Sequence, residues 1–499
     1  MNLTEAKQSL ARLERTLRAY THAMGCLNID GETAAPKNAA AGRGETLAVL
    51  SGVVHGHLTA PATRETIDTL LARKSELDRF DLRRTELLKE ASDELTLVPA
   101  EEYMAYQQLL TEASDVWHDA KLNSDFPAFA PYLEKIVDYN RRLAARKDAS
   151  KPAYDVLLDM FEKGASVEML DPFFDLLRRE LTPLILAVGE KPRPDTSFVD
   201  QPFPIDRQRV FTDRIMALMG IDRDDCTVAE SEHPFTDGFN KHDVRITTHY
   251  HEDMVLSSLY SVIHEGGHAL YELGVDDALQ GTFLAGGSSM GVHESQSRFY
   301  ENIIGRSLPF CRALLPVMAE VFPAQMAGVT PEMLYGAVNA AEPSLIRTEA
   351  DELTYAMHVM VRYELEKALI GGDLRVKDLP GAWNAMYKKY LGVDVPDDRR
   401  GALQDSHWAG GAIGYFPSYA LGSAYGAQML AAMEKDVDVW GSVGAGDLAP
   451  VTGWLREKIH RHGQLLTPAQ LVENACGGPF DPSCFVRYLK DKFSALYGL

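Results

Sequence analysis

The chain has 499 residues, 45% hydrophobic and 24% charged, which is the composition of a folded globular protein and excludes a fibrous or disordered chain. Its 72 acidic and 50 basic side chains give a formal net charge of −22, so we expect no nucleic-acid partner, because such a chain repels phosphate backbones. We expect no membrane-spanning helix either, since no apolar run approaches the roughly 18 residues that a span needs.

The first 190 residues are predicted to be helical almost throughout. In residues 65–95 the apolar side chains recur at threes and fours with charges between them, which is typical of amphipathic helices. Residues 35–44 (APKNAAAGRG) are predicted to form a turn or loop. The first twenty residues are amphipathic and lack the apolar core of a secretory signal, which favours a cytoplasmic protein.

Residues 192–204 contain four prolines and no helical period, so we expect this segment to separate two parts of one 499-residue unit. The first part, 1–190, is helical, and the second, 205–499, carries the chemistry. The clearest strand is 243–250, where apolar and polar side chains alternate. Helix resumes near Glu252, so the predicted fold is mainly α with a small β-sheet near the middle.

The five cysteines are few, odd in number and scattered, which indicates reduced thiols and again a cytoplasmic protein. Histidine is distributed unevenly. Seven of the fifteen histidines lie between His233 and His293. Within that stretch, His264, Glu265 and His268 form an HExxH motif. Four-residue spacing places both imidazoles on one face of a helix, where they can hold one metal ion.

Glu265 is offset by about 100° from His264 around that helix and can reach a water molecule on the ion. Gly266 and Gly267 each cost about 1 kcal/mol against alanine in mid-helix, so we interpret them as places where another chain or a substrate approaches closely. The alternative is a packing helix that carries two histidines by chance. Gly274 is the predicted end of the helix.

A catalytic zinc ion needs a third protein ligand and one open position. Residues 290–305 are predicted to form the next helix, with Ser288 or Ser289 as its cap, and Glu294 is the favoured ligand there. Glu301, two turns further on, is the second choice. His293 is expected to donate to a ligand rather than bind the metal, and Arg298 is placed to orient the Glu294 carboxylate.

With these motifs in view, the chain resembles the metallocarboxypeptidases of the carboxypeptidase Taq type, which are HExxH zincins. The resemblance covers nearly the whole chain and rests on segments that occur in the family's order: DVRIT at 243–247, HEGGH at 264–268, HESQSR at 293–298, IRTEAD at 346–351, GALQDSHW at 401–408 and IHRHG at 459–463. One departure is Cys26–Asp30, which stands where a Trp-Asp pair is expected.

The resemblance implies a two-lobed helical body with a deep substrate groove, and a homodimer. It implies that His264, His268 and Glu294 bind one divalent metal per chain, with zinc favoured and cobalt an alternative, and that Glu265 is the general base. Peptides are the implied substrates. Single C-terminal residues would be removed with broad specificity, sparing proline.

Three residues of a glycine-rich, aromatic stretch are candidates for stabilising the oxyanion of peptide hydrolysis. A histidine and a tyrosine do this in related zincins, so we assign His407 and Tyr419, with Tyr415 as the competing tyrosine. The alternative is that these aromatic side chains only pack.

The candidates for binding the peptide are Arg347, Arg245, His233 and Tyr415. Residues 243–247 are expected to be an edge strand that pairs with the substrate, with Arg245 and Thr247 along the groove. The alternative for Arg245 is a structural salt bridge. His233 is assigned to a loop that touches the substrate backbone.

Arg347 is the predicted clamp for the free C-terminal carboxylate, because a guanidinium binds a carboxylate through two parallel hydrogen bonds. Alternatively, Arg347 forms a structural salt bridge with Glu349 or Asp351. An endo-acting zinc oligopeptidase would lack such a clamp. A non-catalytic, metal-stabilised peptide-binding protein would not need Glu265. Affinity order and availability decide among zinc, cobalt and manganese at such a site.

Overall fold

The helices expected in the first 190 residues are present in the computed structural model, which describes residues 1–499. They are α1 Leu3–Thr33, α2 Ala40–Thr59, α3 Pro61–Leu71, α4 Arg79–Thr96, α5 Ala100–Asn123, α6 Phe126–Lys147, α7 Ala153–Phe161 and α8 Val167–Gly189. The loop predicted at 35–44 is shorter than expected, because α2 already begins at Ala40. The alanine and arginine residues at the start of α2 have high helix propensity, which outweighs the low helix propensity of Gly42 and Gly44.

The rest of the chain contains one small sheet and further helices. They are α9 Ile205–Leu218, β1 Cys226–Glu230, β2 Thr236–Asn240, β3 Asp243–Thr248, α10 Val255–Leu273, α11 Met290–Arg298, a π-helix Phe299–Ile304, α12 Leu308–Val321, α13 Pro331–Val338, α14 Glu352–Gly371, α15 Leu379–Leu391, α16 Pro417–Met433, α17 Val439–Gly444, α18 Ala449–Lys458, α19 Pro468–Cys476 and α20 Ser483–Tyr497. The fold is therefore mainly α, as predicted. None of the helices combines the length and apolarity of a membrane span.

The strand order in the sheet is β1-β3-β2, with β3 parallel to β1 and antiparallel to β2. The expectation that residues 243–247 form an edge strand is therefore wrong: β3 is central. Val244 and Ile246 explain this position, since both are fully buried and a strand between two neighbours gains most from such side chains. The edge strand that contacts the helix expected to bind the metal is β2.

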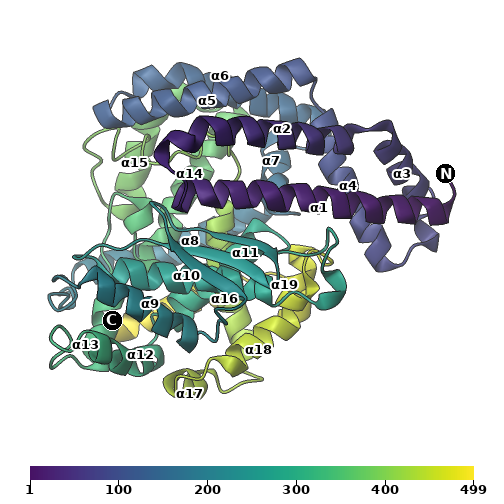
Figure 1. The fold of residues 1–499 in the computed structure, drawn as a ribbon. Coiled ribbons are helices and arrows are strands. Elements are labelled where there is room, and N and C mark those ends of the chain that lie inside the picture. Colours follow the sequence, from purple (N-terminus) through teal and green to yellow (C-terminus); the bar gives the residue numbers. More distant parts are fainter.

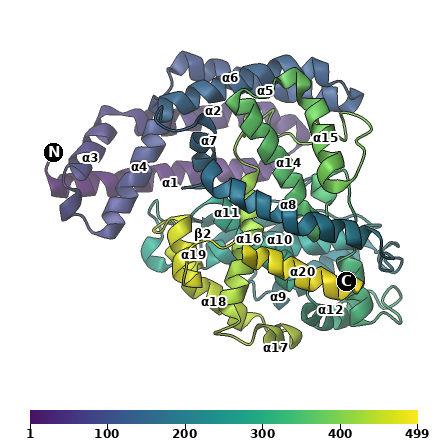
Figure 2. The same cartoon turned by 180° about the vertical axis from the view of Figure 1, so that it is seen from behind.

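The helices form two lobes (Figures 1 and 2). Helices α1–α7 form an upper layer, and the sheet lies below it with α9–α13 and α16–α20. The hydrophobic clusters divide the chain differently from the predicted boundary at 192–204. Helices α1, α3 and α4 share a small cluster of their own, whereas the main cluster runs from Ala113 to Tyr497 and includes residues on both sides of that boundary.

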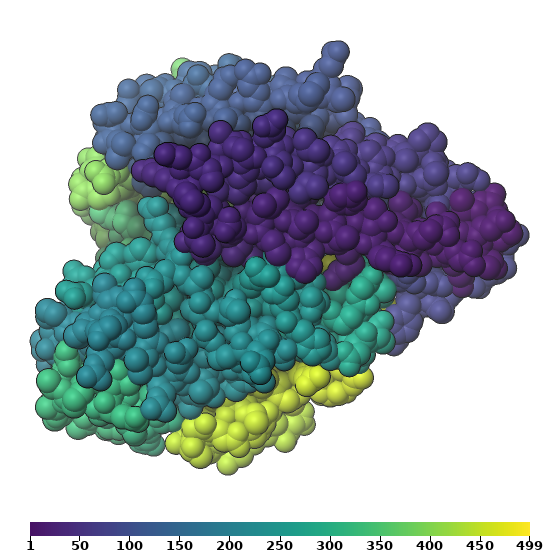
Figure 3. Space-filling model, viewed as in Figure 1, coloured from purple at the N-terminus to yellow at the C-terminus, as the bar shows by residue number.

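A groove separates the lobes next to the expected metal site. Its cavity of about 750 Å³ lies between α4, α6 and α7 on one side and the turn 287–290 on the other, and reaches His293. The purple N-terminal part of the chain lies directly against the teal region of the lower lobe (Figure 3). Arg18 of α1 donates hydrogen bonds there to the backbone oxygens of Phe239 and Thr282. These contacts fix the upper lobe against the lower one at the sheet.

Candidate metal centre

Helix α10 presents the two histidines of the HExxH motif toward a glutamate on α11. The Nε2 atoms of His264 and His268 each lie 3.7 Å from Oε2 of Glu294. One ligand atom from each of the three residues can be chosen so that all lie within 4.8 Å of one another. Ligands of a tetrahedral zinc ion at about 2.0–2.1 Å are about 3.4 Å apart, so this set fits such an ion. With three protein ligands, one position stays open for water or substrate.

Helix α11 begins where the sequence predicts but ends at Arg298, short of the predicted Gly305. Ser289 is its cap and accepts a hydrogen bond from the backbone N–H of Val292. The helix continues as a π-helix to Ile304, directly before Gly305. The second-choice ligand, Glu301, lies on this π-helix. Its carboxylate accepts a hydrogen bond from Nδ1 of His264 at 2.8 Å, so it orients a ligand.

The second histidine of the motif is oriented by a histidine and a glutamate. Nδ1 of His268 lies 2.7 Å from Nδ1 of His293, and Nε2 of His293 lies 2.9 Å from Oε1 of Glu272. Because Glu272 accepts the Nε2 proton of His293, the Nδ1 atom of His293 is left as an acceptor for His268. This leaves the Nε2 lone pair of His268 for the metal. His293 is thus placed as expected, next to a ligand.

Arg298 also lies where the sequence places it. Its Nε donates to Oε1 of Glu294 at 2.8 Å, and Nη1 donates to Glu301 at 3.2 Å. Oε1 of Glu294 is therefore occupied, and Oε2 faces the two histidines. This arrangement fixes which oxygen of the carboxylate can bind the ion.

Glycines at the centre admit neighbouring helices. A Cβ atom at Gly267 would lie 2.7 Å from the backbone oxygen of Gln296 on α11, and one at Gly266 would lie 2.7 Å from Cε of Met219. The close approach expected at these glycines is therefore made by other parts of the chain. Gly422 of α16 has the same role on the far side, since its Cβ would lie 2.7 Å from Cβ of Glu294.

Gly422→Ala is expected to weaken metal binding by about 10- to 100-fold, because the added methyl group displaces Glu294. Isothermal titration of the apoprotein with zinc measures this affinity. Gly426→Ala is the matched control one turn along α16, where the nearest atoms to an added Cβ are 3.4 Å away. Equal affinities in the two variants would contradict the account.

The expected general base, Glu265, is buried next to the edge strand, with 6% of its surface exposed. Thr236, the first residue of β2, donates a hydrogen bond from Oγ1 to Oε2 of Glu265 at 2.6 Å. Burial raises the pKa of Glu265, while His264 and Thr236 act in the opposite direction. Sequence reasoning missed Thr236. Its only signal is its position directly after the His233-Pro234-Phe235 segment.

His407, Tyr415 and Tyr419 lie together. Nε2 of His407 is 3.3 Å from the hydroxyl of Tyr419, and the ring of Tyr415 is 5.2 Å from that of Tyr419. Tyr419 and Gly422 share a face of α16, three residues apart, and Gly422 abuts Glu294. Residues 407–419 therefore form a wall beside the candidate metal site, with Tyr419 on the side that faces Glu294. Burial raises the pKa of each tyrosine.

Burial lowers the pKa of His407 to about 4, with the Arg347 and Arg362 guanidinium groups acting in the same direction. The imidazole is therefore neutral at pH 7. Its Nδ1 atom is buried and has no hydrogen-bond partner within the chain. A neutral imidazole can donate one hydrogen bond and accept another, and Nε2 is the nitrogen that lies next to the Tyr419 hydroxyl.

Arg347 is buried, with 6% of its surface exposed, and its ion-pair partner was not expected. Nε and Nη2 donate to Oδ1 of Asp405 at 3.0 and 2.9 Å, and Nη1 donates to the hydroxyl of Tyr355 at 2.9 Å. Neither Glu349 nor Asp351 pairs with it. Arg362 occupies Oδ2 of Asp405, so two guanidinium groups share one carboxylate and the cluster has a surplus positive charge.

The remaining candidates surround the sheet. Arg245 forms a two-pronged salt bridge with Asp243, at 2.8 and 3.0 Å, which is the alternative considered for it. Thr247 accepts a hydrogen bond from the backbone N–H of Phe235 and so fixes the preceding loop. The His233 side chain on that loop is exposed.

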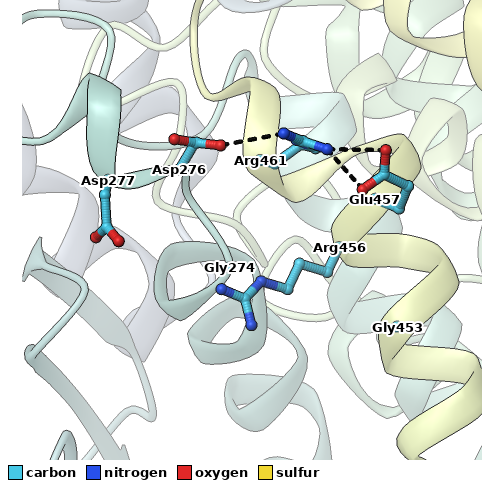
Figure 4. Close-up of a pocket in the computed structure, with 7 residues that line it drawn as sticks. All are labelled: Gly274, Asp276, Asp277, Gly453, Arg456, Glu457 and Arg461. Carbon is cyan, nitrogen blue, oxygen red and sulfur yellow. Dashed lines mark hydrogen bonds and ion pairs between the residues drawn. The ribbon is translucent and has the colours of Figure 1, made fainter.

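A second, polar pocket of about 290 Å³ lies at the C-terminal end of α10, beyond Gly274 (Figure 4). Arg461 spans it, donating to Glu457 and to Asp276. Arg461 is thus already paired, and none of the candidate metal ligands lines this pocket. Its two ion pairs tie the turn after α10 to the end of α18.

The family model described as carboxypeptidase Taq (M32) metallopeptidase matches residues 9–493. Carboxypeptidase 1 of Bacillus subtilis is 39% identical over 487 residues, which is 97% of each chain. Thermostable carboxypeptidase 1 of Thermus thermophilus is 36% identical over 507 aligned positions, covering 99% of each. The solved structure of an M32 carboxypeptidase from Deinococcus radiodurans R1 covers 99% of this chain and 100% of its own, with a TM-score of 0.96 and 37% identity.

Proposed function

The chain belongs to the carboxypeptidase Taq (M32) metallopeptidase family, and from this premise we propose that it hydrolyses the C-terminal peptide bond of peptides, with Glu265 as general base. As a member of this family it is a peptide hydrolase and a metallocarboxypeptidase. The observation that carries the proposed site is the convergence of His264, His268 and Glu294 beside a buried carboxylate at the lobe interface.

The roles follow from the positions of the side chains. A divalent ion at the three ligands would lower the pKa of a water molecule to about 7. Glu265 accepts the proton of the attacking water and passes it to the departing amine, while Thr236 holds the carboxylate in place. Tyr419 and His407 donate to the carbonyl oxygen as negative charge develops on it, with Tyr415 as the competing donor.

The positive cluster under the wall supports recognition of a free C-terminal carboxylate. Arg347 and Arg362 share Asp405, so one positive charge is uncompensated beside Tyr419. An anionic chain end gains from this charge in a site from which water is excluded. Broad specificity and the sparing of proline are proposed on the family resemblance alone. An endo-acting oligopeptidase and a non-catalytic peptide-binding protein are the alternatives.

Digestion of a defined peptide, read by mass spectrometry over time, tests the proposal. A ladder of products that lose single residues from the C-terminus is expected, and the C-amidated peptide should be a poor substrate. Internal cleavage of both peptides would identify an endopeptidase, and an undigested peptide that co-elutes with the protein would identify a binding protein.

Zinc is the proposed resident metal, with cobalt as the alternative. Two imidazoles and one carboxylate form a ligand set that suits zinc, and in a cell metal availability decides between ions of similar affinity. Metal analysis of the purified protein by mass spectrometry identifies the ion.

We expect a cytoplasmic homodimer, supported by the family resemblance and by five cysteines that are all free thiols. Sedimentation equilibrium at micromolar concentration should give twice the 55.2 kDa chain mass. A stable species of the single-chain mass over that range would refute the dimer.

A further inference from the structure

A carboxylate without solvent contact lies behind the wall that carries His407 and Tyr415. Glu366 of α14 is completely buried. Its Oε1 accepts a hydrogen bond from Nε1 of Trp408 at 2.7 Å, and its Oε2 accepts one from the backbone N–H of Gly414 at 2.9 Å. The hydroxyl of Tyr154 on α7 also donates to Oε2, at 2.9 Å. Three donors therefore converge on one carboxylate.

The two oxygens fix the two ends of one short segment, 408–414. His407 directly precedes this segment and Tyr415 directly follows it. The segment contains only turns, without helix or strand, and Gly411 and Gly414 adopt left-handed backbone conformations with φ of 76° and 99°. Such a segment has no regular ladder of backbone hydrogen bonds to fix its course, so its position depends on contacts with its surroundings.

Those surroundings are closely packed. A Cβ atom at Gly414 would lie 2.9 Å from the backbone carbon of Leu157 on α7. The ring of Phe161, also on α7, packs edge-on against Tyr415 with ring centres 5.2 Å apart. The segment is therefore pressed against α7 on one side and fixed by Glu366 on the other.

We propose that Glu366 is a positioning residue that holds His407 and Tyr415 in the geometry needed for transition-state stabilisation. This inference rests on the proposed function, because it assigns the purpose of the anchored segment to the reaction at the metal centre. Glu366 reaches the reaction only through the segment 408–414, and sequence reasoning did not single it out.

The chemistry of the donors makes the carboxylate hard to replace. The indole N–H of Trp408 and the backbone N–H of Gly414 can only donate, and each binds a different oxygen of Glu366. A glutamine has the same shape but only one oxygen, so its amide N–H₂ must face one of these two donors. One end of the segment is then released, and a displacement of about 1 Å costs about 10²-fold in rate.

Glu366→Gln is therefore expected to lower kcat by about 10- to 100-fold, with KM and metal content close to those of the wild type. Activity is measured at pH 8, because burial raises the pKa of Glu366 to about 7 and the wild-type group should be ionised. Glu364→Gln, two residues earlier on α14, is the matched control. It removes a carboxylate that binds the hydroxyl of Tyr390, away from the wall, and should keep the wild-type kcat.

Two further measurements separate positioning from general destabilisation. Hydrogen exchange of the 408–414 amides should become faster in Glu366→Gln while that of α10 stays unchanged. Combining Trp408→Phe with Glu366→Gln should lower kcat by less than the two separate losses multiplied together, because both substitutions release the same segment. If Glu366→Gln does not fold, Trp408→Phe alone frees one end of the segment, and it should lower kcat with faster exchange in 408–414.

A kcat for Glu366→Gln within twofold of the wild type would overturn the proposal, and so would unchanged exchange in 408–414. If Glu366→Gln does not fold and Trp408→Phe does, an unchanged kcat in Trp408→Phe would also overturn the proposal. Failure of the proposed function looks different: the wild type itself would not shorten peptides from the C-terminus. The exchange measurement would still report whether Glu366 holds the segment.

Discussion

Glu265→Gln is expected to lower kcat by about 10²- to 10⁴-fold, because the variant has no base to accept the proton of the attacking water. The amide keeps the volume of the carboxyl group and can still accept the hydrogen bond from Thr236. His264, His268 and Glu294 are untouched, so the variant should bind one metal ion per chain, as the wild type does.

The measurement pairs steady-state kinetics with metal analysis on the same preparation. Thr236→Val is a useful companion, since it leaves the base in place and removes only the hydroxyl that holds it. We expect a smaller loss there than in Glu265→Gln. Unchanged activity in Glu265→Gln, with metal bound, would remove Glu265 from the reaction.

Arg347→Ala is expected to lower kcat/KM on peptides with a free C-terminus by about 30-fold to several thousand-fold. Without the guanidinium, the C-terminal carboxylate of the substrate loses its charge partner in a buried site, and such a truncation costs about 2–5 kcal/mol. The metal should stay bound. C-amidated peptides should already be poor substrates of the wild type and should change little. Kinetics on matched peptide pairs, free acid and amide, give the comparison.

The contacts of Arg347 define the competing outcome. Its guanidinium is held by Asp405 and Tyr355, so its loss also leaves Asp405 with Arg362 alone. Equal losses on acid and amide peptides would show that Arg347 only supports the wall. Arg347→Lys keeps the charge and removes the planar fork, so it should recover binding only in part.

Local patterns were sufficient to predict the helices and the centre of the site. The HExxH spacing places His264 and His268 on one face of α10, and the cap at Ser289 with the stop at Gly305 delimits the helix that carries Glu294. These predictions depend on residues a few positions apart, where periodicity and capping act directly.

Contacts between distant segments could not be predicted in this way. Arg347 pairs with Asp405, 58 residues later, although Glu349 and Asp351 are much closer in sequence. β3 is central because β1 and β2 both pair with it, which its own alternation does not reveal. In the sequence, Glu366 is one of several charged residues on a helix. Its contacts with Trp408 and Gly414 arise only in the folded chain.

The central claim is that His264, His268 and Glu294 hold one divalent ion on which the peptidase activity depends. Titration of chelated, metal-free protein with zinc, with activity and bound metal followed in parallel, tests it most directly. Activity should be absent at the start, rise with bound metal and level off at one ion per chain. Full activity in the metal-free protein, or none at any zinc or cobalt concentration, would contradict the account.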